Sequence, residues 1–179
     1  YAAIDMETAN LNLCSLDNKP WQVGFVAGSI NEGITKSQSI YIKWEDLKIS
    51  KDAARITRFN EEEYRANWKD AKKVLDYIET YLYNPEYRIL FFNGLNFDIY
   101  IHNIWRKALG LKSNYDFLNR VIDVRALVVA DKLGYNIDIN EDLFFWQQKM
   151  MKFYKRGFKS NLTYSCKEYG VEVDESRTH

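Results

Sequence analysis

The sequence is poor in the residues and segments that mark several common protein classes. Its two cysteines, Cys14 and Cys166, lie far apart and match no zinc-ligand spacing, and it has only two histidines, which argues against a structural zinc site. No apolar run approaches the roughly 18–20 residues that cross a bilayer, and the amino end lacks a basic stretch followed by an apolar one. We therefore expect a cytoplasmic protein with reduced thiols and no membrane contact.

An excess of charge of either sign is also lacking. Lys plus Arg and Asp plus Glu both number 25, so no global positive field would attract a long nucleic acid. Any contact with a polynucleotide must then be local. The segment 149–159 interleaves Lys and Arg with Met, Phe and Tyr, and it could supply such a contact or form a solvated amphipathic face.

Length and composition fit one folded domain. The chain has 179 residues, of which 46% are hydrophobic and 28% charged. This length is enough for one full core and short for two. The composition is that of a globular chain, not of a disordered one. We therefore assign residues 1–179 to a single domain.

The strand pattern predicts the fold class. Segments 1–7, 21–30 and 39–44 read as strands joined by short polar links, which indicates an antiparallel meander. Segments 88–92 and 120–124 are short apolar runs of the kind buried in parallel sheets. This order predicts an α/β fold with a mixed five-stranded sheet, three antiparallel strands followed by two parallel ones, flanked by helices.

Helices are predicted between and after these strands. A short one begins at Ser50, and Asn60 followed by Glu63 is typical of the cap of a helix whose apolar residues recur every three or four positions as far as Leu82. Further helices are predicted over 97–109, 127–133 and 161–169, and another from Ser176. No conformation is predicted for 135–158.

Two carboxylates stand on the first predicted strand. Asp5 and Glu7 are two residues apart, so their side chains should share one face of the strand. Two neighbouring anions repel unless they are protonated or bridged by cations. Hard oxygen ligands select magnesium, manganese or calcium, and two divalent ions about 3.5–4 Å apart are the usual apparatus for displacement at a phosphodiester. The pair therefore predicts metal-dependent phosphoryl transfer.

A third carboxylate, Asp98, follows the predicted strand 88–92 by way of the segment that begins at Asn93. Ligands of mixed α/β sheets gather at the carboxyl ends of the central strands. Asp5 and Glu7 lie toward that end of the first strand. If the two strands are neighbours, we expect the three carboxylates to converge.

These motifs resemble those of the DEDD, or DnaQ-like, family of 3′-to-5′ exonucleases, which includes proofreading subunits, oligoribonuclease and RNase T. The family's Asp-x-Glu stands here as Asp5-Met6-Glu7, and its Asn-x-x-x-Phe/Tyr-Asp stands as Asn93 to Asp98. His179 falls where the histidine (DEDDh) branch has its general base. The resemblance implies a ribonuclease H-like fold, with the last Asp of the motif set about five positions after His179 on a C-terminal helix beyond this sequence.

The resemblance also implies roles for the site residues. Asp5 would bridge two Mg²⁺ or Mn²⁺ ions, Glu7 would bind the ion that carries the attacking water, and Asp98 would hold the other ion. His179 would accept the proton of the water, which suits an imidazole with an unperturbed pKa near 6.5. The residues expected to seat the terminal nucleotide are Thr8, Ala9, Asn93 and Phe97.

The resulting hypothesis is a metal-dependent 3′-to-5′ exonuclease that releases nucleoside monophosphates from single-stranded DNA or RNA 3′ ends, with a polymerase or another replication or repair protein as a candidate partner. One alternative is a catalytically weak or inactive nucleic-acid-binding module with the same fold. Another is the tyrosine (DEDDy) branch found in polymerase proofreading domains, although Tyr169 and Asp174 are one residue too far apart for it. His102 and Asp123 are expected to be structural.

Overall fold

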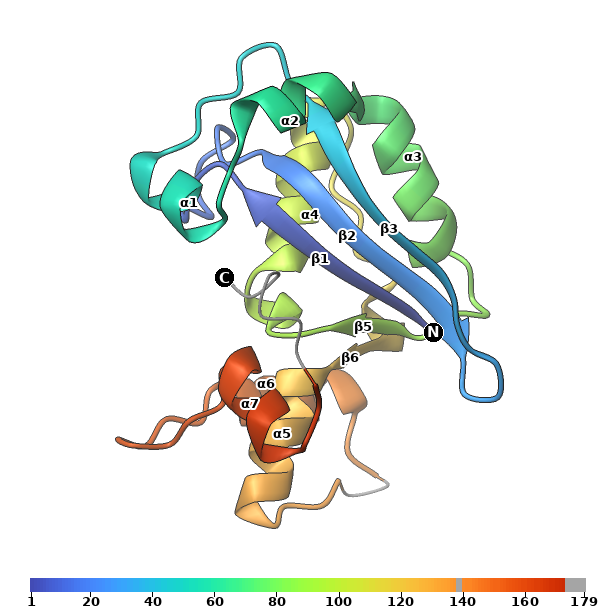
Figure 1. The fold of residues 1–179 in the computed structure, drawn as a ribbon. Helices are drawn as coiled ribbons and strands as arrows, with labels where there is room; N and C mark the ends of the chain where they lie inside the picture. The colour runs from blue at the N-terminus through green and yellow to red at the C-terminus, as the bar shows by residue number, and fades with distance from the viewer. Residues whose placement is uncertain (138–139, 173–179) are drawn as a thin grey trace.

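The computed structural model describes residues 1–137 and 140–172 of the chain. Within these ranges one sheet has the strand order β4-β3-β2-β1-β5-β6, and helices flank it (Figure 1). The strands are β1 (Ala2–Thr8), β2 (Pro20–Ser29), β3 (Gly33–Lys43), β4 (Lys69–Asp70), β5 (Ile89–Phe91) and β6 (Val121–Asp123). The α-helices are α1 (Lys51–Ile56), α2 (Glu61–Asn67), α3 (Ala71–Leu82), α4 (Asp98–Ala108), α5 (Val124–Leu133), α6 (Leu143–Met151) and α7 (Leu162–Glu168).

The sheet confirms the predicted α/β class. β1, β2 and β3 are antiparallel neighbours, while β5 runs parallel to β1 on its other side and β6 runs parallel to β5. The strand β4 has only two residues and pairs parallel with β3 at the edge, so the sheet has one short strand more than expected. The adjacency of β1 and β5 brings the carboxyl ends of these two strands to the same edge of the sheet.

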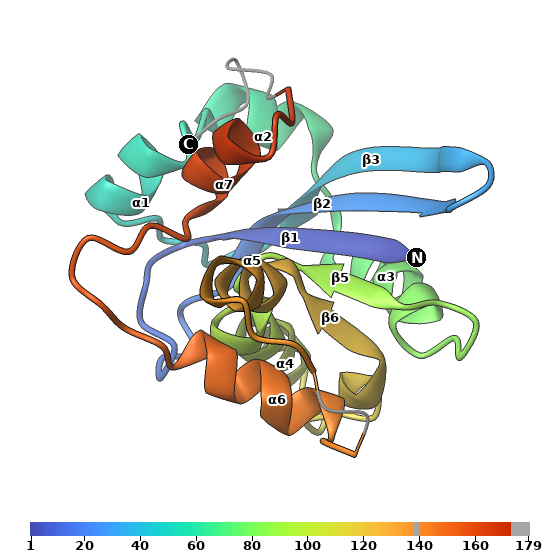
Figure 2. The same ribbon diagram turned by 90° about the horizontal axis from the view of Figure 1, so that it is seen from below.

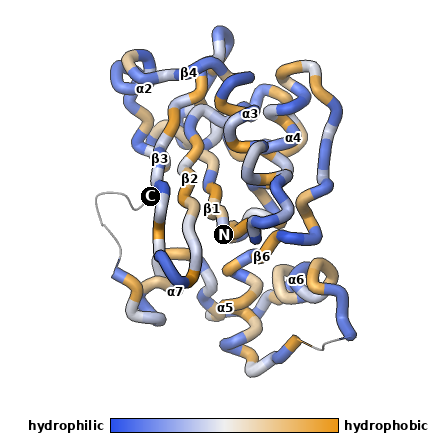
Figure 3. The backbone as a smooth tube through the Cα atoms, turned by 90° about the vertical axis from the view of Figure 1, so that its right-hand side faces the viewer, coloured by the Kyte–Doolittle hydropathy of each residue, from blue (hydrophilic) through white to orange (hydrophobic). Residues whose placement is uncertain are grey.

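Burial alternates along β1. Ile4 and Met6 are each 3% exposed and belong to the core, whereas Asp5 between them is exposed and Glu7 is half-buried. Helix α4 contacts β1 and β2, and α3 contacts β3, so these helices cover one face of the sheet and the other face carries the two acidic side chains (Figures 1 and 2). Figure 3 colours the chain by hydropathy and shows hydrophobic stretches along β1 and β2 and a mostly hydrophilic α2 at the periphery.

The continuous helix predicted over 60–82 is wrong, because the chain forms α2, β4 and α3 there. Asp70 explains the break. Its carboxylate accepts a hydrogen bond from the Lys73 amide at 2.9 Å and thereby caps α3, a role in which the capping residue itself is not helical. Trp68 is extended between the helices and packs edge-on against Tyr64 with ring centroids 5.2 Å apart. The three-and-four spacing of apolar residues therefore persists without a continuous helix.

Helix α6 lies within the segment 135–158, for which the sequence predicts no conformation. It is capped by Asp142, whose side chain accepts from two amides of the first turn. Gln147 on α6 is fully buried, accepts from the Asp123 amide at 2.6 Å and donates to the Val121 carbonyl at 3.0 Å. Its amide group therefore satisfies the outer edge of β6 as a further strand would.

Two other predictions concern helix starts. The helix start predicted at Ser50 and the cap predicted at Asn60 are confirmed, since the Ser50 side chain accepts a hydrogen bond from the Ala53 amide in α1 and the Asn60 side chain accepts from two amides in the first turn of α2. The helix predicted to begin at Ser176 lies outside the described residues. No helix that the structure describes combines the length and apolarity needed to span a bilayer.

Candidate functional site

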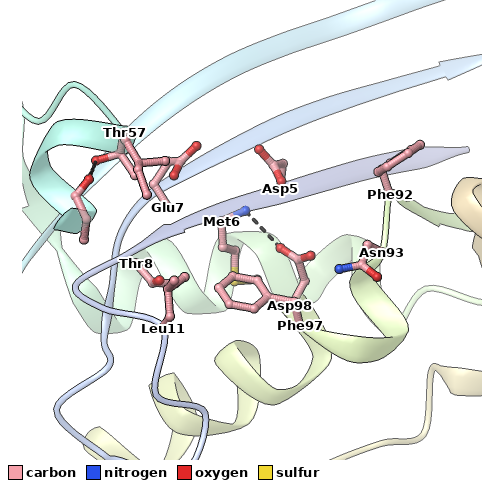
Figure 4. A pocket seen from close by; sticks show the side chains of 12 residues that line it. Asp5, Met6, Glu7, Thr8, Leu11, Thr57, Phe92, Asn93, Phe97 and Asp98 are labelled. Carbon is pink, nitrogen blue, oxygen red and sulfur yellow. Dashed lines mark hydrogen bonds between the residues drawn. The ribbon is translucent and has the colours of Figure 1, made fainter. Parts of the chain in front are cut away.

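A cavity of about 230 Å³ lies at the carboxyl ends of β1 and β5 (Figure 4). β1 supplies one wall, the turn after β5 and the first turn of α4 supply another, and α1 closes the rim. The lining residues are Asp5, Met6, Glu7, Thr8, Leu11, Ala53, Ile56, Thr57, Phe92, Asn93, Phe97 and Asp98. The structure thus brings Asp5, Glu7 and Asp98 to one cavity, and it places Thr8, Asn93 and Phe97 there as well.

Burial and a neighbouring negative charge raise the pKa of two carboxyl groups in the cavity. Burial, and after it the negative charge of Asp5, raises the pKa of Glu7 to about 7. Burial raises the pKa of Asp98 well above its usual range, and the charges of Asp5 and Asp123 add to that effect. Asp98 is only 3% exposed, so water screens this repulsion poorly. The cavity therefore favours uptake of positive charge, either as protons or as a cation.

A divalent cation fits the donor chemistry of this cavity, because hard oxygen ligands suit magnesium and manganese. Within residues 1–137 and 140–172, however, no group of three or more His, Cys, Asp and Glu side chains is placed to hold one metal ion. In Figure 4 the Asp98 carboxylate points to the β1 backbone, and Glu7 lies on the same side of the cavity as Thr57. The carboxylates therefore share the cavity without forming a closed set of metal ligands.

A buried hydrogen bond ties Asp98 to the strand that carries the other two acids. The Met6 amide donates to Asp98 Oδ1 at 3.0 Å, and Met6 lies between Asp5 and Glu7 (Figure 4). Because the donor is a backbone group of β1, the first turn of α4 is held against the strand. Two distant parts of the sequence are thereby fixed relative to each other at the cavity.

The turn from β5 to α4 has a tight backbone. Asn93 lies in the left-handed region with φ +67°, which costs free energy for a residue with a side chain and is found preferentially at functional sites. The next residue must be small, because a Cβ on Gly94 would overlap the ring of Phe91. The Asn93 amide donates to Asp123 Oδ1 at 2.9 Å, and the Arg125 guanidinium donates to Asn93 Oδ1 at 3.1 Å. The turn is therefore held in one conformation from the β6 side.

The rim of the cavity opposite this turn is apolar, and the sequence does not mark its residues as part of a site. Leu11 is 72% exposed and Ile56 is 43% exposed, yet both line the cavity. Thr57 lines it too and donates to the Ala53 carbonyl at 2.8 Å. The next residue, Arg58, shares with Asn93 a positive φ, which in Arg58 is 52°. Exposed apolar groups beside a polar cavity are typical of a ligand-contacting surface, but a single Leu in a loop leaves no periodic signal in the sequence.

One predicted site residue, Ala9, does not line the cavity, and another falls outside the part of the chain that the structure describes. Ala9 is fully buried and does not line it; its amide donates to the Lys19 carbonyl at 3.1 Å and its carbonyl accepts from the Ser50 amide at 2.9 Å. Ala9 thus joins the loop after β1 to the start of α1. His179, the predicted general base, lies outside the described residues.

Tyr169, His102 and Asp123 do not line the cavity that holds Asp5, Glu7 and Asp98. Tyr169 follows α7, and its hydroxyl donates to the Asp131 carboxylate in a separate apolar cavity between α5 and α7. Its partner in the tyrosine-branch alternative, Asp174, lies outside the described residues. His102 is 1% exposed and pairs with Glu79 on α3 at 2.9 Å, as expected for a structural histidine. Asp123 is a buried cap of α5.

The sheet order, in which β1 lies between antiparallel β2 and parallel β5, is that of a ribonuclease H-like α/β fold. No family model and no curated protein matches the sequence. Solved structures of exonuclease I match the fold. E. coli exonuclease I in complex with a dA16 oligonucleotide aligns with a TM-score of 0.73 and 19% identity over 98% of this chain and 36% of that one.

Two further structures give the same result. Exonuclease I in complex with SSB-Ct aligns with a TM-score of 0.72 and 19% identity over 98% of this chain and 37% of that one. A zinc-bound complex of E. coli exonuclease I with single-stranded DNA aligns with a TM-score of 0.63 and 19% identity over 73% of this chain and 29% of that one. At such identity the likeness shows a shared fold. The chain spans 29–37% of the length of these three exonuclease I chains.

Proposed function

We propose that residues 1–179 form the exonuclease domain of a metal-dependent 3′-to-5′ exonuclease of the histidine branch, which releases nucleoside monophosphates from single-stranded DNA or RNA. One observation carries the proposal. Asp5 and Glu7 on β1 and Asp98 at the start of α4, just beyond the parallel neighbour β5, line one cavity in a fold shared with exonuclease I. The raised pKa values of Glu7 and Asp98 support a site that takes up cations.

In this proposal Asp5, Glu7 and Asp98 would hold Mg²⁺ or Mn²⁺. The bound ions would supply Lewis acidity and neutralise charge at the scissile phosphodiester. The Met6 amide keeps the Asp98 carboxylate at β1, so that this ligand does not have to be ordered when a cation binds. His179 would take the proton of the attacking water.

The remaining lining residues would seat the 3′-terminal nucleotide. The half-buried ring of Phe97 offers a face for stacking, which is worth about 1–3 kcal/mol per base and is tolerant of base identity. The exposed side chains of Leu11 and Ile56 would cover the other side of the nucleotide and exclude water. Thr8 and Asn93 line the same cavity as the carboxylates and would contact the sugar and the terminal phosphate groups.

Partners are proposed from the same likeness. The compared exonuclease I structures contain oligonucleotides and, in one case, SSB-Ct. For this chain we accordingly propose a single-stranded 3′ end as ligand and a replication or repair protein as a candidate partner. The carboxylate ligands favour magnesium or manganese over the zinc found in one of those structures.

The proposal is tested with the full chain and 5′-end-labelled single-stranded DNA and RNA oligomers, in Mg²⁺ or Mn²⁺ and with excess EDTA. We expect products that shorten from the 3′ end and disappear with EDTA. Asp5→Asn and Asp98→Asn should each lower kcat by on the order of 100-fold or more, because each removes a charge that stabilises the transition state through the metal.

Asp17→Asn is the matched control. Asp17 is exposed in the loop between β1 and β2, and the same change of charge there should leave kcat unaltered. The proposal fails if Asp5→Asn and Asp98→Asn retain activity within a few-fold of the parent. A folded parent protein that binds the oligomers without shortening them would support the binding-module alternative.

A further inference from the structure

Asp123, at the end of β6, has a carboxylate that holds a neighbouring loop. The residue is 0% exposed, and it accepts hydrogen bonds from three backbone amides. Oδ1 accepts from Asn93 at 2.9 Å and from Arg125 at 3.0 Å, and Oδ2 accepts from Leu95 at 3.0 Å. Only the bond from Arg125 is the ordinary cap of α5. The other two reach across to the turn between β5 and α4.

That turn leads directly to the cavity. It begins at Asn93, whose positive φ needs support from the surroundings, and it ends at Phe97 and Asp98, which line the cavity. Its far end is fixed by the bond between the Met6 amide and Asp98. The segment 93–98 is therefore anchored at both ends, at β1 through Asp98 and at β6 through Asp123.

We propose that Asp123 is a positioning residue of the candidate site, which acts through the amides of Asn93 and Leu95 to set the place of Phe97 and Asp98. The catalytic part of this inference rests on the proposed exonuclease function. A carboxylate is suited to the role because both of its oxygens accept, so the two loop amides and the α5 amide are all satisfied. An Asn side chain offers one acceptor oxygen, and its NH₂ group would face one of the loop amides.

If Asp123 only stabilised the fold, a substitution that weakens the same region elsewhere should lower kcat as much as Asp123→Asn does. A substitution of Gln147 tests this. Gln147 is as deeply buried as Asp123 and is bonded to the Asp123 amide and the Val121 carbonyl. Its bonds hold β6 to α6 and none reaches the turn 93–98. Gln147→Met therefore weakens the same corner of the fold and leaves the Asp123 carboxylate on the loop.

The experiment compares the full-length parent with Asp123→Asn and Gln147→Met at a temperature where circular dichroism shows all three to be folded. We expect Asp123→Asn to lower kcat on a single-stranded oligomer by on the order of 10-fold to 100-fold with KM changed less than about 3-fold, since ligand and ring are misplaced for the chemical step. Gln147→Met should lower Tm and keep kcat within about 3-fold of the parent. Equal losses of kcat in the two variants would overturn the inference.

Amide hydrogen exchange provides a readout that does not depend on activity. In the parent, the amides of Asn93 and Leu95 should exchange as slowly as those in the body of α4, although they lie in a turn. Exchange at both should accelerate at least about 10-fold in Asp123→Asn and stay unchanged in Gln147→Met. Fast exchange in the parent would overturn the inference even if Asp123→Asn does not fold.

These readouts keep the two proposals apart. A parent without exonuclease activity but with slow exchange at Asn93 and Leu95 would contradict the proposed function and support the anchoring by Asp123. An active parent with fast exchange at these amides would support the proposed function and contradict the anchoring by Asp123. Asp142→Asn adds a control for the chemical change itself, because Asp142 also caps a helix through backbone amides and its contacts lie away from the cavity.

Discussion

His102 shows how a residue can be close in sequence to a candidate catalytic group and still belong to another part of the fold. It lies one helical turn after Asp98 on α4, but its ring is 1% exposed and Nε2 is 2.9 Å from Glu79 on α3. Arg106 pairs with the same Glu79 oxygen, and Tyr83 packs edge-on against the imidazole with ring centroids 6.3 Å apart. His102 therefore links α4 to α3 through Glu79.

The buried imidazole predicts a pH dependence of stability. Burial lowers the pKa of His102, an effect that the bond to Glu79 only partly offsets, so the unfolded chain binds a proton below about pH 6.5 that the folded chain does not. The stability contributed by neutral His102 is thus complete above pH 6.5 and is lost as the pH falls toward its pKa in the folded protein. The loss should approach about 1.4 kcal/mol per pH unit at most.

Urea unfolding of the parent and His102→Gln between pH 7.5 and 5.5 measures this effect. Gln can donate to Glu79 but does not titrate. As the pH falls from 7.5 to 5.5, the free energy of unfolding of the His102→Gln variant should therefore fall less than that of the parent. Comparing the two proteins cancels the opposite contribution of Glu7 and Asp98, whose raised pKa values favour the folded state at lower pH. If the free energies of unfolding of the parent and of His102→Gln change in parallel with pH, His102 is not the group responsible for the pH dependence.

The break between α2 and α3 shows how a single cap can override periodicity. The apolar spacing runs through both helices, but the helix itself is interrupted. Asp70 starts α3 as a new helix, because its carboxylate accepts a hydrogen bond from the Lys73 amide. Asp70→Ala should lower the free energy of unfolding by about 1 kcal/mol, within a range of roughly 0.5–2, as measured by urea denaturation. Asp76→Ala on the same helix removes only an exposed pair with Lys72 and should cost less than about 0.5 kcal/mol. An Asp70→Ala loss no greater than that of Asp76→Ala would contradict the capping role.

Local patterns predicted the elements that carry the acids. β1 has the alternation of a half-buried strand, so the shared face of Asp5 and Glu7 could be read directly, and the apolar run of β5 marked the turn that leads to Asp98. The sequence alone does not show that the three acids lie together, because the adjacency of β1 and β5 depends on contacts between residues some ninety positions apart. The hydrogen bond from the Met6 amide to Asp98 is one such contact. The structure supplies that contact.

Other parts of the site depend on packing that leaves no local pattern. Gln147 reads as one polar residue in an aromatic segment, and only its bonds to β6 explain its burial. Asp123 could be recognised as a cap, but its bonds to Asn93 and Leu95 join residues about thirty positions apart. Leu11 is an exposed loop residue until the fold brings α1 beside it at the rim of the cavity.

The chain as a whole combines a formal net charge of zero with a locally acidic cavity. Lys plus Arg and Asp plus Glu both number 25, so long-range attraction of a polyanion is weak, and the cavity itself would repel a phosphodiester. Bound cations would reverse the sign of the charge there. The proposed function therefore depends on metal binding more than on any other property of the molecule.

Diffraction from crystals of the full chain soaked in Mn²⁺, collected at an energy where manganese scatters anomalously, tests that dependence most directly. We predict an anomalous peak in the cavity between β1 and the start of α4, with carboxylate oxygens of Asp5 and Asp98 as ligands, and its loss in Asp5→Asn crystals. A cavity with no manganese at saturating Mn²⁺, or manganese bound only elsewhere on the molecule, would contradict the proposal that these acids form a metal-dependent nuclease site.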